Sequence, residues 1–340
     1  MTSPGTAETP CRSPTVSVVM SVFNDACYLR RAIESILEQE GAELEFIIVD
    51  DGSTDGSAAI LDEYAGRDPR VRVIRQANAG LTRSLIRGCK EARGEFIARQ
   101  DADDVSLPGR LARQVSMLKG DDRLVFVSSW ADVIGPADEW VMTIERPADV
   151  EEASRLLLDD RTGPPGRGSV MMRRAAYVRV GGYRPEFYYA QDADLWLRLG
   201  EIGLLGYVPE VLYRYRMSSH SISGRNGVKQ AFARLVDECR EARRNGRSEE
   251  PILARAPAVP VQAPRGSRRS EAATNYFLGR NIVRHQPRQA LPYLWACVRA
   301  NPLHGRGWLV LGAAAVLAVG RHRGRSGNDA RRFDKTSGQS

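Results

Sequence analysis

The chain has 340 residues, 42% of them hydrophobic, which is enough for two domains or for one large domain with an appendage. Five widely spaced cysteines without a CxxC pair, and an N-terminus without an apolar signal segment, argue against a secreted disulfide scaffold and favour a reducing compartment. No run reaches the roughly 18 apolar residues that a membrane-spanning helix needs, so none is predicted.

The net charge of +7 is unevenly distributed along the chain. Residues 1–239 contain 30 Lys and Arg against 36 Asp and Glu, a net charge of −6, whereas residues 240–340 contain 19 against 6, a net charge of +13. An acidic body joined to a basic C-terminal part indicates two tasks. The basic part could meet anionic lipid or nucleic acid, or simply form a solvated surface. Nucleic acid is not expected as a partner, because aromatic residues are sparse in this stretch.

Alternating strands and helices are predicted in the first 130 residues. Short valine- and isoleucine-rich runs, typical of strands buried on both faces, occupy 16–23, 44–50, 71–74, 95–100 and 124–130. Segments with helical spacing of apolar residues lie between them, at 28–39, 57–66, 81–93 and 108–120. This order predicts an α/β fold in which helices cover a mostly parallel sheet.

The alternation weakens after residue 140. The turn-rich loop GPPGRG (163–168) precedes a helical segment at 195–203 and a strand-like one at 205–217, and 226–244 is expected to be helical. Pro-, Ala- and Arg-rich residues 245–270 read as a linker, and 271–320 as a helical C-terminal region. Residues 1–14 and the basic residues 321–340 are expected to be disordered tails.

Acidic residues gather where predicted strands and one helix end or begin. Ligands of open parallel sheets bind beyond the carboxyl ends of the strands, so these clusters are candidate site residues, although each alone could be a turn or a helix cap. In the extended segment RQDADD, residues two apart face the same way, and Mg²⁺ or Mn²⁺ would compensate such carboxylates. The clustered acids are Asp50, Asp51, Asp101, Asp103, Asp104, Asp192 and Asp194.

Four segments, PTVSVVMSVFND, IIVDDGSTDGS, GEFIARQDADDVSLPGRL and GGYRPEF with QDADLWLRL, together resemble the family 2 glycosyltransferases of GT-A fold. The resemblance covers roughly residues 14–225. It implies a Rossmann-like GT-A catalytic domain over 15–225, with a nucleotide-binding half at 15–130 and an acceptor-binding half at 131–225.

The resemblance also implies roles for individual residues. The nucleotide would lie against the first strand, the VDDGSTDGS turn and the DxD acids, with a UDP-sugar as the default donor and dTDP or GDP left open. Asp101 and Asp103 match the metal-binding acids, and Asp192 matches the proposed catalytic base. The residues implied to contact the nucleotide are Val22, Asn24, Asp50, Asp51 and Asp101.

Two departures from the family pattern concern the base and the metal. Gln191 stands where a glutamate usually precedes the base, and Ser218 stands near the place of a histidine that helps bind metal, with His220 two residues later. In the acceptor half, GPPGRG, Arg173 and Tyr183 are expected to line the acceptor site.

The implied reaction is a metal-dependent single displacement that inverts the sugar's anomeric configuration, in cell-surface polysaccharide synthesis. Without a QxxRW motif, transfer of one sugar to a glycan or lipid-linked acceptor is expected rather than polymerisation. A non-catalytic nucleotide-sugar or glycan-binding module and a haloacid-dehalogenase-type phosphatase remain alternatives.

A last expectation concerns location. The 12-residue run WLVLGAAAVLAV (308–319), flanked by arginines, is too short to span a bilayer but could lie in the interface of an anionic membrane. The expected location is cytoplasmic, peripheral at the inner face of the membrane.

Overall fold

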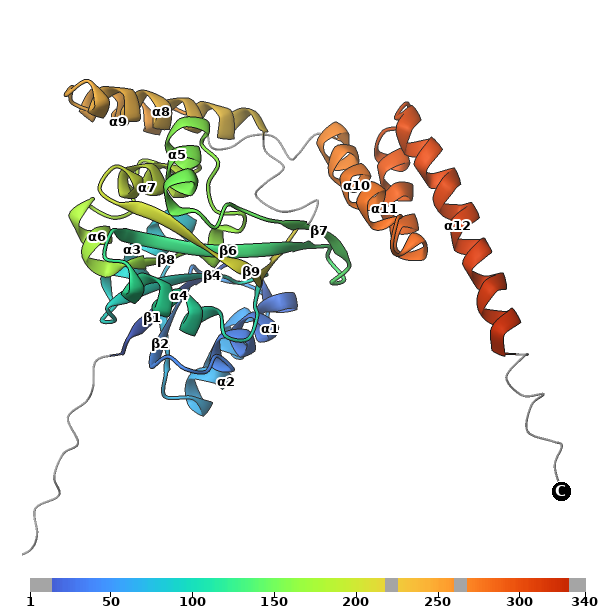
Figure 1. Ribbon diagram of the computed structural model, residues 1–340, viewed down its shortest axis with the longest axis horizontal. Coiled ribbons are helices and arrows are strands. Elements are labelled where there is room, and N and C mark those ends of the chain that lie inside the picture. Colours follow the sequence, from blue (N-terminus) through green and yellow to red (C-terminus); the bar gives the residue numbers. More distant parts are fainter. Residues whose placement is uncertain (1–13, 218–225, 260–267, 330–340) are drawn as a thin grey trace, which may run out of the picture. The chain divides into compact units, whose positions relative to one another are not determined.

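The computed structural model describes residues 14–217, 226–259 and 268–329 (Figure 1). The chain divides into two compact units. Unit 1 contains the described residues of 1–131, 144–215 and 231–259. Unit 2 contains those of 132–143, 216–230 and 260–340.

The central sheet has the strand order β3-β2-β1-β4-β8-β6-β9-β5, with β7 paired to β6. Its first four strands run parallel, which confirms the prediction, whereas β8 pairs antiparallel with both β4 and β6, and β5 pairs antiparallel with β9. The strands are β1 (Val16–Val22), β2 (Leu44–Asp50), β3 (Val71–Arg75), β4 (Phe96–Asp101), β5 (Val105–Ser106), β6 (Leu124–Ile134), β7 (Trp140–Ile144), β8 (Met171–Arg173) and β9 (Leu204–Arg216).

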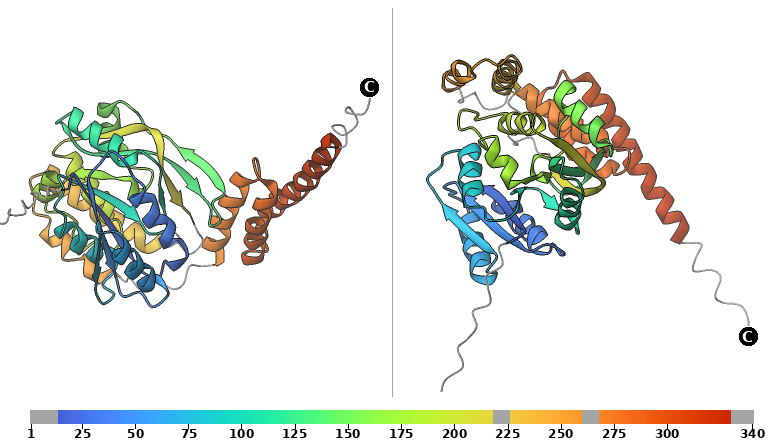
Figure 2. Two further views of the ribbon diagram at one scale, coloured as in Figure 1. Left: turned by 90° about the horizontal axis from the view of Figure 1, so that it is seen from below. Right: turned by 60° about the vertical axis from the view of Figure 1, so that its left-hand side comes forward.

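Helices cover both faces of the sheet, because the first strands are apolar on both sides (Figures 1 and 2). One core holds buried residues of α1, α2 and α4 against one face, and a second core holds those of α3, α6 and α7 against the other. The helices of this part are α1 (Ala26–Leu37), α2 (Ser57–Arg67), α3 (Leu81–Lys90), α4 (Arg110–Gly120), α5 (Val150–Asp160), α6 (Arg174–Arg179), α7 (Gln191–Gly200), α8 (Asn226–Arg244) and α9 (Glu250–Leu253).

Several elements were not predicted from the sequence. Strands β5, β7 and β8 are short, and β6 continues to Ile134 rather than ending at 130. Helix α5 did carry a sequence signal, because aspartate is favoured at the N-cap position and Asp149 directly precedes the helix. In the structure its side chain accepts a hydrogen bond from the Glu152 N–H at 2.7 Å.

The C-terminal part is helical as predicted, with different limits. Unit 2 contains α10 (Arg268–Ile282), α11 (Pro287–Ala300) and α12 (Gly305–Asp329), so helix extends beyond residue 320, where the tail was expected to begin. The expected linker at 245–270 differs as well, since α9 and a 3₁₀ turn (Ala256–Ala258) lie within it. Among the described residues, no helix is long and apolar enough to cross a membrane.

Candidate active site

Three predicted site residues lie level with one another at the carboxyl ends of neighbouring strands. In the parallel register Val22 of β1 pairs with Asp50 of β2, and Ser21 of β1 pairs with Asp101 of β4. The side chain of Val22 is fully buried in the core, so this residue can offer a ligand only its backbone. The edge predicted for ligand binding is therefore formed by Asp50, Asp101 and the loops that follow them.

Arg99, which sequence reasoning did not single out, joins the two ends of the predicted catalytic machinery. Its side chain, only 3% exposed, donates from Nε to Asp101 Oδ1 at 3.0 Å and from a terminal nitrogen to Asp192 Oδ1. Burial disfavours the charged guanidinium, but the carboxylates of Asp101 and Asp192 outweigh it and hold the pKa of Arg99 well above its ordinary value. Arg99 stays cationic and fixes both carboxylates.

Asp192, the predicted base, is buried at the start of α7. Its Oδ1 accepts the bond from Arg99 and another from the Tyr183 hydroxyl at 3.2 Å. Burial first, and then the negative charge of Asp192, raise the pKa of Tyr183 well above its ordinary value, so Tyr183 remains a hydroxyl donor. The other oxygen, Oδ2, has longer contacts, with Gln191 Nε2 at 3.3 Å and Arg167 Nε at 3.6 Å.

The GPPGRG loop, predicted to line the acceptor site, lies beside Asp192. Its Arg167 is 45% exposed on the side chain and faces Asp192 Oδ2. The next residue, Gly168, leaves no room for a side chain, because a Cβ there would lie 1.9 Å from the Tyr213 hydroxyl and 2.8 Å from the Asp101 backbone nitrogen. The loop therefore rests directly on the end of β4.

The acids of RQDADD are compensated in two different ways. Asp104 is fully buried beside the cation of Arg110, which itself is buried and donates to Gln100 Oε1 at 3.0 Å, so this acid belongs to the core. Asp101 is held by Arg99, and Asp103 is partly exposed. Arginines thus supply part of the compensation that the sequence alone assigned to a metal.

The remaining carboxylates nevertheless fit a divalent cation. Burial is the main cause that raises the pKa of Asp25 to about 6, and the nearby negative charges of Asp101 and Asp55 add to it, which places these carboxylates close to one another. Oxygen ligands are those that Mg²⁺ and Mn²⁺ prefer, and such ions often take one or two carboxylates with substrate phosphates. In the described part of the chain no three His, Cys, Asp or Glu residues form a metal-holding group, so Asp101 and Asp103 would need such added ligands.

Asp51 and Asn24 shape the loops around the nucleotide edge. Asp51 is 1% exposed, and its two oxygens accept hydrogen bonds from the N–H groups of Ala79 and Gly80, both at 2.8 Å. Asn24 accepts a 2.7 Å bond from the Thr54 N–H, which ties the end of β1 to the VDDGSTDGS turn. Both residues therefore position backbone around the edge.

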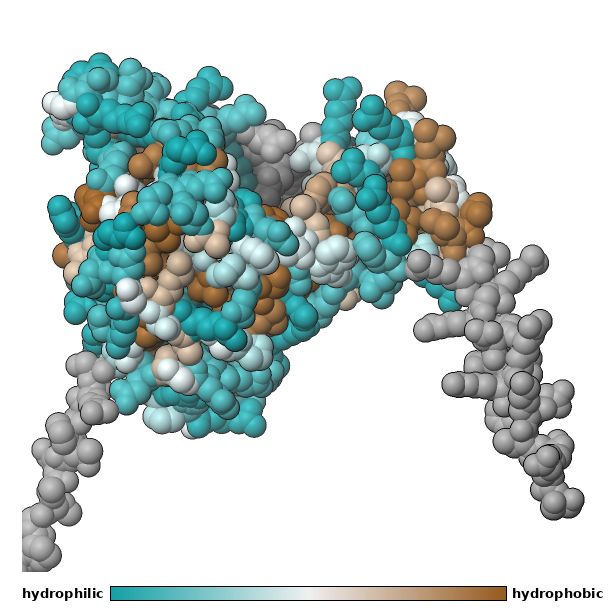
Figure 3. Space-filling model, in the orientation of Figure 1, coloured by the Kyte–Doolittle hydropathy of each residue, from teal (hydrophilic) through white to brown (hydrophobic). Residues whose placement is uncertain are grey.

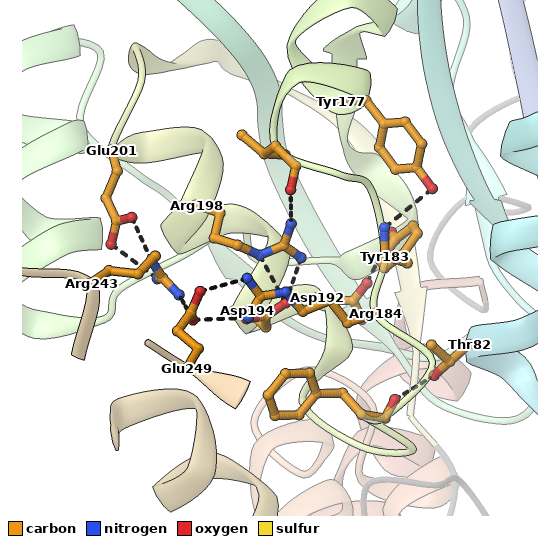
Figure 4. A network of polar contacts seen from close by, with 12 residues as sticks. Thr82, Tyr177, Tyr183, Arg184, Asp192, Asp194, Arg198, Glu201, Arg243 and Glu249 are labelled. Atoms are coloured by element: carbon orange, nitrogen blue, oxygen red, sulfur yellow. Dashed lines mark hydrogen bonds and ion pairs between the residues drawn. The ribbon is translucent and has the colours of Figure 1, made fainter. Parts of the chain in front are cut away.

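Asp194, the second acid of QDAD, has a structural role. It is completely buried and forms ion pairs with Arg198, one turn along α7, and with Arg184 at 3.5 Å. Figure 4 shows how this network continues through Glu249 to Arg243. The two acids of QDAD therefore separate into one at the candidate site and one in a scaffold.

One predicted acceptor residue lies elsewhere. Arg173 pairs with Phe96, at the amino end of β4, and its guanidinium donates to the carbonyl oxygen of Leu124 at 2.8 Å. This is the opposite end of the strand from Asp101, so the prediction that Arg173 lines the acceptor site is wrong. His220 and Ser218 lie outside the described residues.

Comparison with known proteins identifies the class. The family model described as Glycosyl transferase family 2 matches residues 17–181. EpsE of Bacillus subtilis (strain 168), named as a glycosyltransferase, is 35% identical over 227 residues, which cover 63% of this chain and 77% of EpsE. Chondroitin synthase of Pasteurella multocida (strain Pm70) is 26% identical over 215 residues, 63% of this chain and 22% of the synthase.

Solved structures show the same fold at lower identity. TarS 1–349 of S. aureus, determined in complex with UDP-GlcNAc, has a TM-score of 0.55 at 16% identity, over 84% of this chain and 88% of TarS. The mannosyltransferase PcManGT from Pyrobaculum calidifontis, determined with GDP-Man and Mn²⁺, has a TM-score of 0.51 at 21% identity, over 92% of this chain and 83% of PcManGT.

These findings define a glycosyltransferase of GT-A fold. The chain belongs to glycosyltransferase family 2. Membership of this family contradicts the phosphatase alternative.

Proposed function

We propose that this glycosyltransferase moves one sugar from a nucleotide-diphosphate sugar to a hydroxyl of a glycan or lipid-linked acceptor, with inversion at the anomeric carbon. The observation that carries the proposal is the chain of contacts from Asp101 through Arg99 to Asp192, at the carboxyl ends of β1, β2 and β4. A UDP-sugar is the first candidate donor. The UDP-GlcNAc complex of TarS supports it, while the GDP-Man complex of PcManGT keeps GDP open.

Asp192 would act as the general base in a single displacement. The acceptor oxygen forms a bond to the anomeric carbon, the bond from that carbon to the diphosphate oxygen breaks, and its electron pair leaves with the nucleotide diphosphate. The acceptor's proton passes to Asp192, whose Oδ2 is the less tightly held oxygen. Arg99 and Tyr183 hold Oδ1, which keeps the carboxylate oriented.

Asp101 and Asp103 would hold Mg²⁺ or Mn²⁺ together with the donor's phosphates. When bound, the ion supplies positive charge that stabilises the departing diphosphate. The partial exposure of Asp101 and Asp103 at the carboxyl end of β4 supports this assignment.

Substitution of Asp192 by Asn tests the base. The amide keeps the shape but accepts no proton, so Asp192→Asn should transfer sugar about 10²–10⁴-fold more slowly, with nucleotide-diphosphate affinity changed by less than about threefold. Transfer is measured with a panel of nucleotide sugars by product and diphosphate release, and affinity by calorimetry. Asp122→Asn is the control, because Asp122 lies in the loop between α4 and β6 and its side chain is fully exposed.

Two results would contradict the proposal. Normal transfer by Asp192→Asn would mean that another group accepts the proton. Full transfer in excess chelator, or by Asp103→Ala, would remove the metal from the mechanism.

A further inference from the structure

Helix α12 of unit 2 buries small apolar residues and exposes large ones. Ala314 and Ala318 are buried, whereas Leu309 is 76% and Val316 72% exposed. A surface helix ordinarily buries its large apolar side chains and exposes small or polar ones. In Figure 3 the coloured part of α12, residues 305–318, is predominantly hydrophobic on the side that faces the viewer. The large apolar face of this helix is therefore available to something outside unit 2.

The exposed face continues onto α11 through two tryptophans. Trp295 of α11 and Trp308 of α12 are 55% and 47% exposed, and their rings meet edge to face with centroids 6.3 Å apart. Beside Trp295 lies a groove of about 730 Å³ between α10 and α11, which is also lined by Arg268, Arg299 and Glu271. Large apolar side chains, paired tryptophans and exposed arginines thus adjoin one another.

Charge identifies what this face would meet. Residues 268–318 contain seven arginines, all exposed, and a single acidic residue, so this segment carries a net charge of +6. A second copy of the chain would bring the same positive charge against it. An anionic lipid surface brings the opposite charge, and tryptophan and arginine are the side chains that suit the boundary between headgroups and acyl chains.

We propose that α11 and α12 bind an anionic membrane surface, with Leu309, Val316 and the two tryptophans in the acyl boundary and arginines on the phosphates. The exposed apolar stretch from Trp308 to Leu317 is about 15 Å long at 1.5 Å per residue, half of a hydrocarbon core, so the helix lies in the interface. This inference concerns location and does not depend on the proposed reaction.

The experiment is sedimentation of the full chain with phosphatidylcholine vesicles that contain or lack phosphatidylglycerol. Binding to the anionic vesicles should weaken with salt. Leu309→Gln/Val316→Gln should bind more than tenfold less, since it loses the inserted side chains. Arg268→Gln/Arg299→Gln should lose about fivefold per arginine, roughly 25-fold together. Val178→Gln is the control, because Val178 is 65% exposed on α6 of unit 1. This variant should bind vesicles as the native chain does.

Circular dichroism checks that the exposed substitutions leave the helices intact, and diphosphate release from the donor checks the catalytic unit. The proposal is overturned if the native chain stays in the supernatant at low salt, or if Leu309→Gln/Val316→Gln and Val178→Gln bind equally. It is also overturned if ultracentrifugation shows a dimer that Leu309→Gln/Val316→Gln dissociates while no form binds vesicles, because the occupant is then a second copy.

Discussion

Arg99 holds two acids that are distant in sequence and would act on the two substrates. Its forked guanidinium reaches Asp101 and Asp192 at once, which a single ammonium group could not do with the same geometry. Arg99 and Asp192 are almost completely buried, whereas Asp101 is partly exposed, so the guanidinium joins a buried carboxylate to one that solvent can reach. Arg99 is a positioning residue, because it acts on the reaction through these acids.

Replacement of Arg99 should slow transfer. In Arg99→Gln the carboxylates of Asp101 and Asp192 lose the guanidinium that contacts both of them, so their relative position should no longer be fixed. At neutral pH the rate should fall by about 10²-fold or more. Arg99→Lys keeps the charge and should retain more of the rate.

The measurement is kcat and kcat/KM for transfer at pH 7, with thermal unfolding of each variant as a check on folding. Arg113→Gln is the control, because Arg113 forms an exposed pair with Glu210 on the surface. Equal kcat values for Arg99→Gln and the native protein, or equal losses in Arg99→Gln and Arg99→Lys, would exclude the role given to Arg99.

At the scale of elements, arginine–carboxylate pairs attach the last helices of unit 1 to the segment around α7. Glu249, just before α9, pairs with Arg184 at 2.8 Å and with Arg243 of α8, while Arg184 also faces Asp194 of α7 (Figure 4). These pairs explain why the Pro- and Ala-rich segment after residue 245 includes an ordered helix. Its composition resembles a linker, but Glu249, its first acidic residue, is anchored by two arginines.

Glu249→Gln should destabilise unit 1 at neutral pH. Burial raises the pKa of Glu249, but the hydrogen bonds and charges of Arg184 and Arg243 outweigh burial and hold it below the usual value of 4.5. A carboxyl with a lowered folded-state pKa contributes stability above its unfolded pKa and loses it as pH falls through the folded one. The free energy of unfolding should therefore drop by about 2 kcal/mol at pH 7, less than for a fully buried pair.

Urea unfolding at pH 7 and at lower pH measures this loss, which should shrink as the pH falls below 4.5. Glu210→Gln removes an exposed surface pair and should change stability by about 0.5 kcal/mol or less. An equal loss at both pH values for Glu249→Gln would mean that packing, and not charge, explains it.

The parallel half of the fold and the acids at its edge were predictable, because strand and helix periodicity is strong before residue 130 and parallel strands end at one edge. The partners of those acids were harder to predict. Arg99 had a signal, since it stands two residues before Asp101 on the same face of β4, but its contact with Asp192 depends on a tertiary contact that no local pattern encodes. Arg173 was misplaced because β8, only three residues long, runs antiparallel.

At the scale of the whole molecule, the chain combines two units of different character. Unit 1 contains the acids of the candidate site and most of the mixed sheet, whereas unit 2 contains the basic helices α10 to α12 with nearly all of β7. Asp51, Asp101 and Asp192 all lie in unit 1. The opposite net charges of the two parts of the sequence thus follow a division that the fold also makes.

Ligand-dependent hydrogen exchange should distinguish the units. UDP and Mn²⁺ at about 100 times the dissociation constant should add about 2.7 kcal/mol to the stability of the state that binds them. Amides of β1, β2 and β4 should then exchange more slowly, while those of α10 to α12 should not change. Mass spectrometry of the exchanged peptides measures both regions in one sample, with Asp122→Asn as a control that should respond as the native chain does. New protection within 268–300 would show that unit 2 takes part in nucleotide binding.

The hydrogen bonds of Asp51 have a consequence for conformational entropy. Gly80 has a φ of +90°, a conformation that favours glycine, and its N–H and that of Ala79 donate to the buried carboxylate of Asp51. Ordering a residue costs about 1–2 kcal/mol of backbone entropy, and these hydrogen bonds offset part of that cost within the folded chain. In the proposed function the nucleotide would meet a loop that these bonds order, so its contacts there would contribute to affinity with little loss for loop ordering.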